Sequence, residues 1–280
     1  MTTPSEAWQA LSAWQPQQLT DLVAHDPQAR LQALVRNVAD IRFDFAKTHL
    51  DGEALAILSG LAEAQDFVGR RKMLFSGGIA NPTEKRAAEH SAERGEGAPE
   101  SVHVAQALHQ RMRMMVDAIE AGAFGEIRHL LHIGIGGSAL GPDLLIDALG
   151  RHSERYDVAV VSNVDGAALA EAFATFDPAY TLVAVASKTF TTTETLLNAA
   201  SALQWLEEGG VDDPLGCFIA LTANPDKAME WEIDETRILP FNETVGGRYS
   251  LWSSIGFPAA LALGWDAFAD LLEGAAEMDR

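Results

Sequence analysis

The stretch His132-Ile133-Gly134-Ile135-Gly136-Gly137-Ser138-Ala139-Leu140-Gly141-Pro142 has the pattern of a junction between a strand and a helix. It follows the apolar pair Leu130-Leu131 and precedes Asp143-Leu144-Leu145-Ile146, whose apolar spacing fits a short helix. Glycines let the backbone turn tightly and approach a ligand, and a helix start offers unpaired N–H groups to an anion. The stretch therefore predicts a buried strand, a glycine loop, and a helix with proline in its first turn.

The same loop also fits the dinucleotide-binding fingerprint G-x-G-x-x-A, at Gly134, Gly136 and Ala139. That fingerprint needs an acidic residue about 20 positions further on, at the end of a second strand. Asp165 is the nearest candidate and lies somewhat late. A nicotinamide-dependent dehydrogenase is thus a rival interpretation, which failure of NAD(P)H to bind would dismiss.

Composition narrows the class of protein. The 280 residues are 48% hydrophobic, so the chain can bury a sizeable core in one large or two smaller domains. The net charge of −20 argues against a nucleic-acid or anionic-membrane partner, since both reward clustered Lys and Arg. We find no signal peptide and no membrane-spanning apolar run, and the single cysteine excludes an internal disulfide. We expect a cytoplasmic protein.

Helical patterns fill the first part of the chain. Thr3-Pro4-Ser5-Glu6 has the form of a capping box, and Asp26-Pro27 begins a second helix, with Leu31, Leu34, Val35 and Val38 on one face. Residues 53–67 and 102–121 continue the helical pattern. A further helix is predicted from the Asn81-Pro82 start to residue 94; its basic side chains form either a solvated face or part of a site.

From residue 125 short apolar runs alternate with helical stretches, which predicts an α/β domain with a mainly parallel sheet flanked by helices. The expected strands are Leu130–Ile135, Val158–Val161, Leu182–Ala186, Phe218–Leu221 and Ile238–Phe241. We therefore expect a helical N-terminal region over residues 1–120 and the α/β domain over residues 121–270. Residues 271–280 are then the start of a connection to a further part of the protein.

A second loop follows the third expected strand: Ser187-Lys188-Thr189-Phe190-Thr191-Thr192-Thr193-Glu194-Thr195, leading into a helix. Its hydroxyls and helix-start N–H groups can donate to a phosphate, and Lys188 adds a point charge. Helix capping would need one or two of these threonines at most. A dinucleotide site has no need of this second cradle, whereas a small phosphosugar must be held from more than one side.

A third stretch, Val245-Gly246-Gly247-Arg248-Tyr249-Ser250, presents an arginine beside paired glycines. An arginine in this setting can meet an anion or a developing oxyanion, and a structural salt bridge is the alternative.

Together these stretches resemble the glucose-6-phosphate isomerase (phosphoglucose isomerase) family. The likeness rests on Ile133–Ser138, Ser187–Thr192 and Gly246–Ser250, and the segment Asn81–Ala87 is similar to the family's N-terminal region. The resemblance implies a sugar-isomerase (SIS) domain in a homodimer whose active site lies near the subunit boundary. It implies a substrate-phosphate site of Gly137, Ser138, Ser187, Lys188, Thr189 and Thr192, with Arg248 as the catalytic arginine.

The sequence departs from the family pattern at Ala139, where aspartate is usual, at His132, where asparagine is common, and at Thr193, where glutamine is common. The family's glutamate base, its ring-opening histidine and its lysine are expected beyond Arg280, so the chain is expected to be an N-terminal portion. The resemblance implies conversion between glucose 6-phosphate and fructose 6-phosphate, with no redox cofactor and no metal. A non-catalytic regulatory phosphosugar-binding SIS module remains the alternative.

Overall fold

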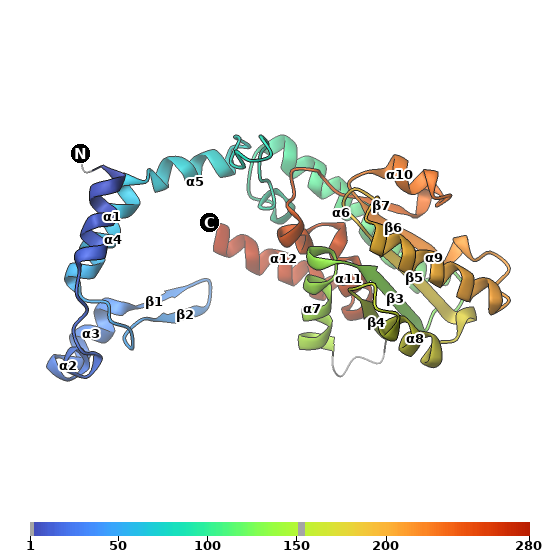
Figure 1. Ribbon diagram of the computed structural model, residues 1–280, viewed down its shortest axis with the longest axis horizontal. Coiled ribbons are helices and arrows are strands. Elements are labelled where there is room, and N and C mark those ends of the chain that lie inside the picture. Colours follow the sequence, from blue (N-terminus) through green and yellow to red (C-terminus); the bar gives the residue numbers. More distant parts are fainter. Residues whose placement is uncertain (1–2, 151–154) are drawn as a thin grey trace. The chain divides into compact units, whose positions relative to one another are not determined.

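The computed structural model describes residues 3–150 and 155–280, and the chain divides into two compact units after Ser76. The first unit contains short helices and one hairpin (Figure 1). Its elements are α1 (Pro4–Ala13), α2 (Leu19–His25), α3 (Pro27–Leu34), β1 (Val35–Val38), β2 (Ile41–Asp44), α4 (Gly52–Ala64) and α5 (Phe67–Phe75).

The capping box predicted at the start of the chain is present. The Thr3 side chain accepts a hydrogen bond from the backbone N–H of Glu6, and the Glu6 carboxylate accepts one from the backbone N–H of Thr3 at 2.7 Å. Two orphan N–H groups of α1 are thereby satisfied reciprocally.

Two helix predictions in this unit were wrong at their ends. The helix from Pro27 stops at Leu34, because Val35–Val38 instead pairs with Ile41–Asp44 as an antiparallel hairpin. Its two-residue turn has positive φ at both positions, which closes a tight hairpin. The expected helix over residues 53–67 is interrupted at Asp66, whose left-handed backbone ends one helix while its side chain caps the next.

The second unit, from Gly77 to Asp279, is built on a five-stranded parallel sheet with strand order β4-β3-β5-β6-β7 (Figure 1). The strands are β3 (His129–Gly134), β4 (Asp157–Val161), β5 (Thr181–Ala186), β6 (Phe218–Thr222) and β7 (Ile238–Pro240). All five predicted strands are therefore confirmed within a residue or two, as is the predicted α/β fold class.

Helices connect and cover these strands. The longer ones are α6 (Pro99–Glu120), α7 (Leu140–Gly150), α8 (Gly166–Thr175), α9 (Thr193–Glu208), α10 (Pro225–Glu230), α11 (Phe257–Leu263) and α12 (Trp265–Asp279). Short 3₁₀ helices also occur in this unit, namely η1 (Ala92–Arg94), η2 (Gly136–Ser138), η3 (Pro178–Tyr180), η4 (Leu215–Cys217), η5 (Glu235–Arg237), η6 (Gly247–Trp252) and η7 (Ser254–Gly256).

Alternate side chains of the strands enter two separate cores, one on each face of the sheet. Leu130 packs with residues of α6, α11 and α12, whereas its neighbour Leu131 packs with residues of α8, α9 and α10. Both faces are covered, which is why the strands are apolar throughout rather than alternating.

The segment from Asn81 to Arg94 is not the predicted helix. Asn81 and Arg86 exchange backbone hydrogen bonds across a tight turn, and the Asn81 side chain caps this turn by accepting from Glu84 N–H. An Asn-Pro start suits a turn as well as a helix, and here the turn forms because Asn81 pairs with Arg86 across it.

The domain boundaries at 120 and 270 stay predictions. In the part of the chain that is described, no helix has the length and apolarity to cross a membrane.

Candidate functional site

The strand order of the sheet reverses between β3 and β5. From β3 the chain passes to β4 on one side, and from β5 it passes to β6 and β7 on the other. In parallel sheets ligands bind outside the carboxyl ends of the strands at such a point. Gly134 and Ala186, the last residues of β3 and β5, are register partners. The glycine loop and the hydroxyl loop therefore leave the sheet side by side.

In the glycine loop, Gly136 has a left-handed φ of 61°, and Gly137 packs on the backbone of Gly247. A Cβ atom at Gly137 would lie 2.1 Å from the Gly247 oxygen, so no side chain fits there. Ser250 Oγ donates to the Gly247 oxygen at 2.7 Å and to the Gly137 oxygen at 3.4 Å. The first and third stretches are thus joined through their backbones.

His132 fixes the other side of the glycine loop from within the sheet. Its ring is fully buried, and Nε2 lies 2.7 Å from the Ser138 oxygen. Because a carbonyl oxygen can only accept, Nε2 carries the hydrogen and donates it. Burial lowers the pKa of His132 to about 4, so the ring is neutral at neutral pH.

The hydroxyl loop is anchored by Phe190, which is buried in the core despite a left-handed φ of 51°. This turn brings Ser187 Oγ and Thr192 Oγ1 to 3.1 Å from each other. Further out, Thr191 Oγ1 donates to Thr189 Oγ1 at 2.8 Å. The loop therefore holds two pairs of hydroxyl groups at the start of α9.

Thr192 is the N-cap residue of α9, yet its side chain makes no capping hydrogen bond. The hydroxyl is turned to Ser187 instead, so it leaves the N–H groups of the first helical turn to a ligand. A helix start of this kind attracts an anion through those N–H groups and the helix dipole.

Lys188 joins the hydroxyl loop to the third stretch. Its ammonium donates to the backbone oxygens of Glu243 at 2.6 Å and Val245 at 3.0 Å, which leaves one of its three N–H groups for a ligand. The Glu243 oxygen also accepts from Arg86. Burial, and then the positive charge of Arg86, lower the pKa of Lys188.

Arg248 lies in η6, directly after Gly246 and Gly247, and its side chain is exposed. Within residues 3–150 and 155–280 no acidic side chain pairs with it, unlike Arg94, which binds Asp279. The alternative of a structural salt bridge therefore finds no support among the described residues. Arg248 is therefore an exposed cation on the turn that packs against the glycine loop.

The structure thus brings together all three stretches that the sequence predicted as site components, while their individual roles stay predictions. Sequence reasoning missed the contributions of His132 and Ser250 as supports of the glycine loop. A histidine within an apolar strand, two residues before Gly134, was a usable signal for the role of His132. Nothing in the sequence pattern indicated the role of Ser250.

The structure gives less support to two other kinds of site, a dinucleotide site and a metal site. Asp165, the acidic residue that the dinucleotide interpretation needs, caps α8 by accepting from Ala167 N–H. A group of three or more His, Cys, Asp or Glu side chains able to hold a metal ion does not occur in the described ranges.

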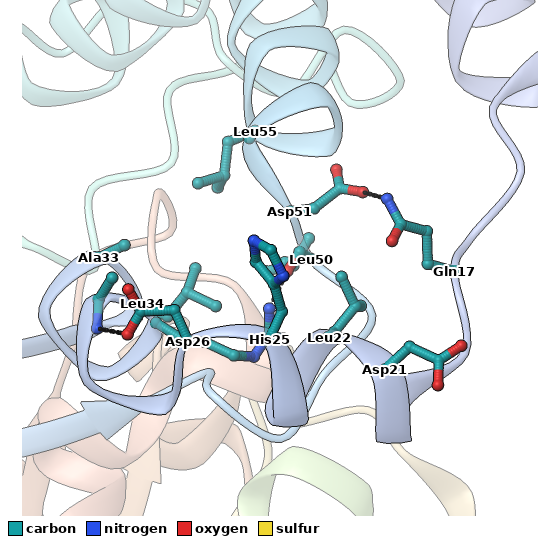
Figure 2. Close-up of a pocket in the computed structure, with 13 residues that line it drawn as sticks. Gln17, Asp21, Leu22, His25, Asp26, Ala33, Leu34, Leu50, Asp51 and Leu55 are labelled. Carbon is teal, nitrogen blue, oxygen red and sulfur yellow. Dashed lines mark hydrogen bonds between the residues drawn. The ribbon is translucent and has the colours of Figure 1, made fainter.

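The first unit contains a cavity of about 500 Å³ between apolar side chains and a polar rim (Figure 2). Figure 2 shows Leu22, Leu34 and Leu55 around it, with Asp51 bound to Gln17 at the rim. Arg30, also in its lining, donates to the oxygens of Ala46, Thr48 and Leu50 and so organises the loop between β2 and α4. The cavity includes none of the predicted site residues.

Comparison with known proteins agrees with this fold. The phosphoglucose isomerase family model matches residues 44–280. The glucose-6-phosphate isomerase of Sphingopyxis alaskensis is 87% identical over the whole chain, which covers 56% of that protein. That of Rhizorhabdus wittichii is 64% identical, with the same coverage.

Among solved structures, a glucose-6-phosphate isomerase from Chlamydia trachomatis matches with a TM-score of 0.86 and 27% identity, over 98% of this chain and 55% of that one. The chain spans about half the length of the curated relatives it matches. The fold class is an α/β protein with a parallel sheet, in which a glycine loop and a hydroxyl loop follow the two strands where the strand order reverses. The match to the family model identifies the family. The chain belongs to the phosphoglucose isomerase family.

Proposed function

We propose that the chain is the N-terminal portion of a glucose-6-phosphate isomerase, which interconverts glucose 6-phosphate and fructose 6-phosphate through a cis-enediol. The observation that carries the proposal is that Lys188 of the hydroxyl loop and Gly137 of the glycine loop both contact the stretch that presents the exposed Arg248. The family match and the likeness to glucose-6-phosphate isomerases of other bacteria support it.

The substrate phosphate would sit at the start of α9. Ser187, Thr189 and Thr192 supply hydroxyl donors, Ser138 adds one from the glycine loop, and Lys188 supplies charge. The sugar would lie beside the backbone of Gly137, which itself packs on the backbone of Gly247. In a chain of net charge −20, this local concentration of hydrogen-bond donors is what would favour the binding of an anion.

Isomerisation requires ring opening and then transfer of a proton between C1 and C2 by a carboxylate. Arg248 has the permanent charge needed to stabilise the enediolate oxygen that develops between these steps. Glu194 lies in the first turn of α9, next to the proposed phosphate site. We assign the base and the ring-opening groups to the part of the protein beyond residue 280. We also propose a cytoplasmic homodimer.

The test compares the full-length protein with residues 1–280 alone, in a coupled assay of fructose 6-phosphate conversion. The full-length protein should turn over and the 280-residue chain should not, because we assign the carboxylate base to the part of the protein beyond residue 280. Adding the C-terminal remainder should restore turnover. Robust turnover by residues 1–280 alone would show that the base is in this chain.

A regulatory phosphosugar-binding module is the second candidate. Binding of fructose 6-phosphate by the full-length protein without any conversion would favour that function over the isomerase.

A further inference from the structure

The basic segment over residues 81–94 contacts the residues that directly precede the third stretch, which carries Arg248. Glu89 N–H donates to the Thr244 oxygen at 3.1 Å, and Arg86 donates to the Glu243 oxygen. The segment therefore borders the loop that leads into η6. Its contacts continue along η6 itself.

The first of these contacts is a ring stack. The His90 and Tyr249 rings lie 4.4 Å apart between centroids, with 16° between their planes, and Tyr249 directly follows Arg248. Burial, and then the charge of Arg94, lower the pKa of His90. Its Nδ1 is buried with no hydrogen-bond partner among the described residues. Stacking is thus the main interaction that this ring makes.

The far end of η6 is held at Trp252 by two more basic side chains. The Arg94 guanidinium lies over the indole ring, 4.9 Å from its centroid, and is fixed there by two hydrogen bonds to Asp279 at 2.6 and 2.9 Å. His109 Nε2 lies 2.8 Å from the Trp252 oxygen, and the buried Glu93 carboxylate lies 3.1 Å from the same nitrogen.

We propose that His90, Arg94 and His109 form a clamp, the η6 clamp, which positions Arg248 for the isomerase reaction. A short 3₁₀ helix with glycine at its first residue has little stability of its own, so external contacts must set its place. Ser250 ties one side of η6 to the glycine loop, and the η6 clamp holds the other side. The clamp residues are positioning residues that act through η6.

This inference rests on the proposed isomerase function, so the test begins with turnover by the full-length wild-type protein. His90→Ala removes the stack, and His90→Phe keeps an aromatic ring but no titrating nitrogen. We expect kcat to fall about 2- to 12-fold in His90→Ala, the effect of losing one stacked pair at the transition state. KM should change little, and His90→Phe should recover most of kcat.

The matched control is His129→Ala. His129 stacks on Phe176 at 4.6 Å and 11°, at the amino-terminal end of β3, opposite to the end that leads into the glycine loop. This variant should lose a similar amount of thermal stability with kcat unchanged. In an Arg248→Ala background, His90→Ala should have no further effect on kcat, since the clamp acts through that arginine.

A wild-type protein without isomerase activity would refute the proposed function rather than the clamp. Given an active wild type, an unchanged kcat in His90→Ala would overturn the clamp. So would a His90→Phe variant as slow as His90→Ala with an altered pH profile, which would make His90 a proton carrier. A full additional loss in the Arg248→Ala background would overturn it as well.

Discussion

The backbone of Gly137 packs directly against the carbonyl group of Gly247, at a separation that leaves no room for a methyl group. Gly137→Ala should therefore push η6 away from the glycine loop. Overpacking of this kind costs roughly 1–3 kcal/mol of unfolding free energy, and the displacement of Arg248 should also lower kcat. Urea denaturation and steady-state kinetics of the full-length variant measure the two effects.

Gly166→Ala is the control for Gly137→Ala. Gly166 begins α8, and a Cβ atom there would meet nothing within 4 Å. This variant should keep its stability and its kcat. Equal behaviour of the two variants would contradict the close packing of Gly137 on Gly247.

Ser187→Ala and Thr192→Ala should each raise KM for fructose 6-phosphate, with a smaller effect on kcat. Each hydroxyl would donate to a charged phosphate, a bond worth roughly 1.5–3 kcal/mol, or about 10- to 100-fold in KM. The bond is made alike in ground and transition states. Ser201→Ala, an exposed hydroxyl on the same helix that bonds the Leu197 oxygen, should leave KM unchanged. Unchanged KM in both loop variants would remove the loop from the site.

Arg248→Ala should depress kcat more than it weakens substrate binding, because the enediolate charge appears after the substrate is bound. Arg248→Lys should rescue the loss in part, since an ammonium lacks the planar guanidinium fork. Arg128, an exposed arginine paired with Glu126 just before β3, is the matched control, and Arg128→Ala should keep kcat. A rise in KM alone for Arg248→Ala would reassign the residue to ground-state binding.

His132 should make the protein less stable in mild acid. Its pKa is depressed in the folded state to about 4 from an ordinary 6.5, so between these values the unfolded chain binds a proton that the folded chain does not. Stability is therefore full above pH 6.5 and falls as pH drops toward 4, by roughly 3 kcal/mol at the lower end. Urea denaturation across this range should show a shallower loss for His132→Asn than for the wild type. An identical loss in both would contradict the assignment to His132.

The sequence was informative where local pattern and final environment agree. The five strands could be predicted because each contains a short apolar run, and the three central strands are buried almost throughout. The glycine and hydroxyl loops could be predicted for the same reason, since their chemistry is written in consecutive residues. Phe190 shows the limit, because its left-handed backbone is held by burial in a core formed by distant segments.

Contacts between segments that are distant in the chain could not be predicted from the sequence. Asn81-Pro82 has a helix-start pattern, but it forms a turn whose Arg86 bonds Glu243, 157 positions further along the chain. The stack of His90 on Tyr249 likewise joins residues that no periodicity relates. Such pairings depend on where two surfaces meet after folding, and a local pattern cannot specify them.

The start of α9 has no side-chain cap, so a bound anion would complete it. Asp165 caps α8 and Asp51 caps α4 by accepting from first-turn N–H groups, whereas Thr192 leaves that place open. A bound phosphate would supply the missing acceptor and close the helix end. The first turn of α9 should therefore exchange its amide hydrogens quickly in the empty protein and slowly when phosphosugar is present. The free energy of unfolding should then rise with the concentration of phosphosugar, and the folded protein should persist longest when its substrate is abundant.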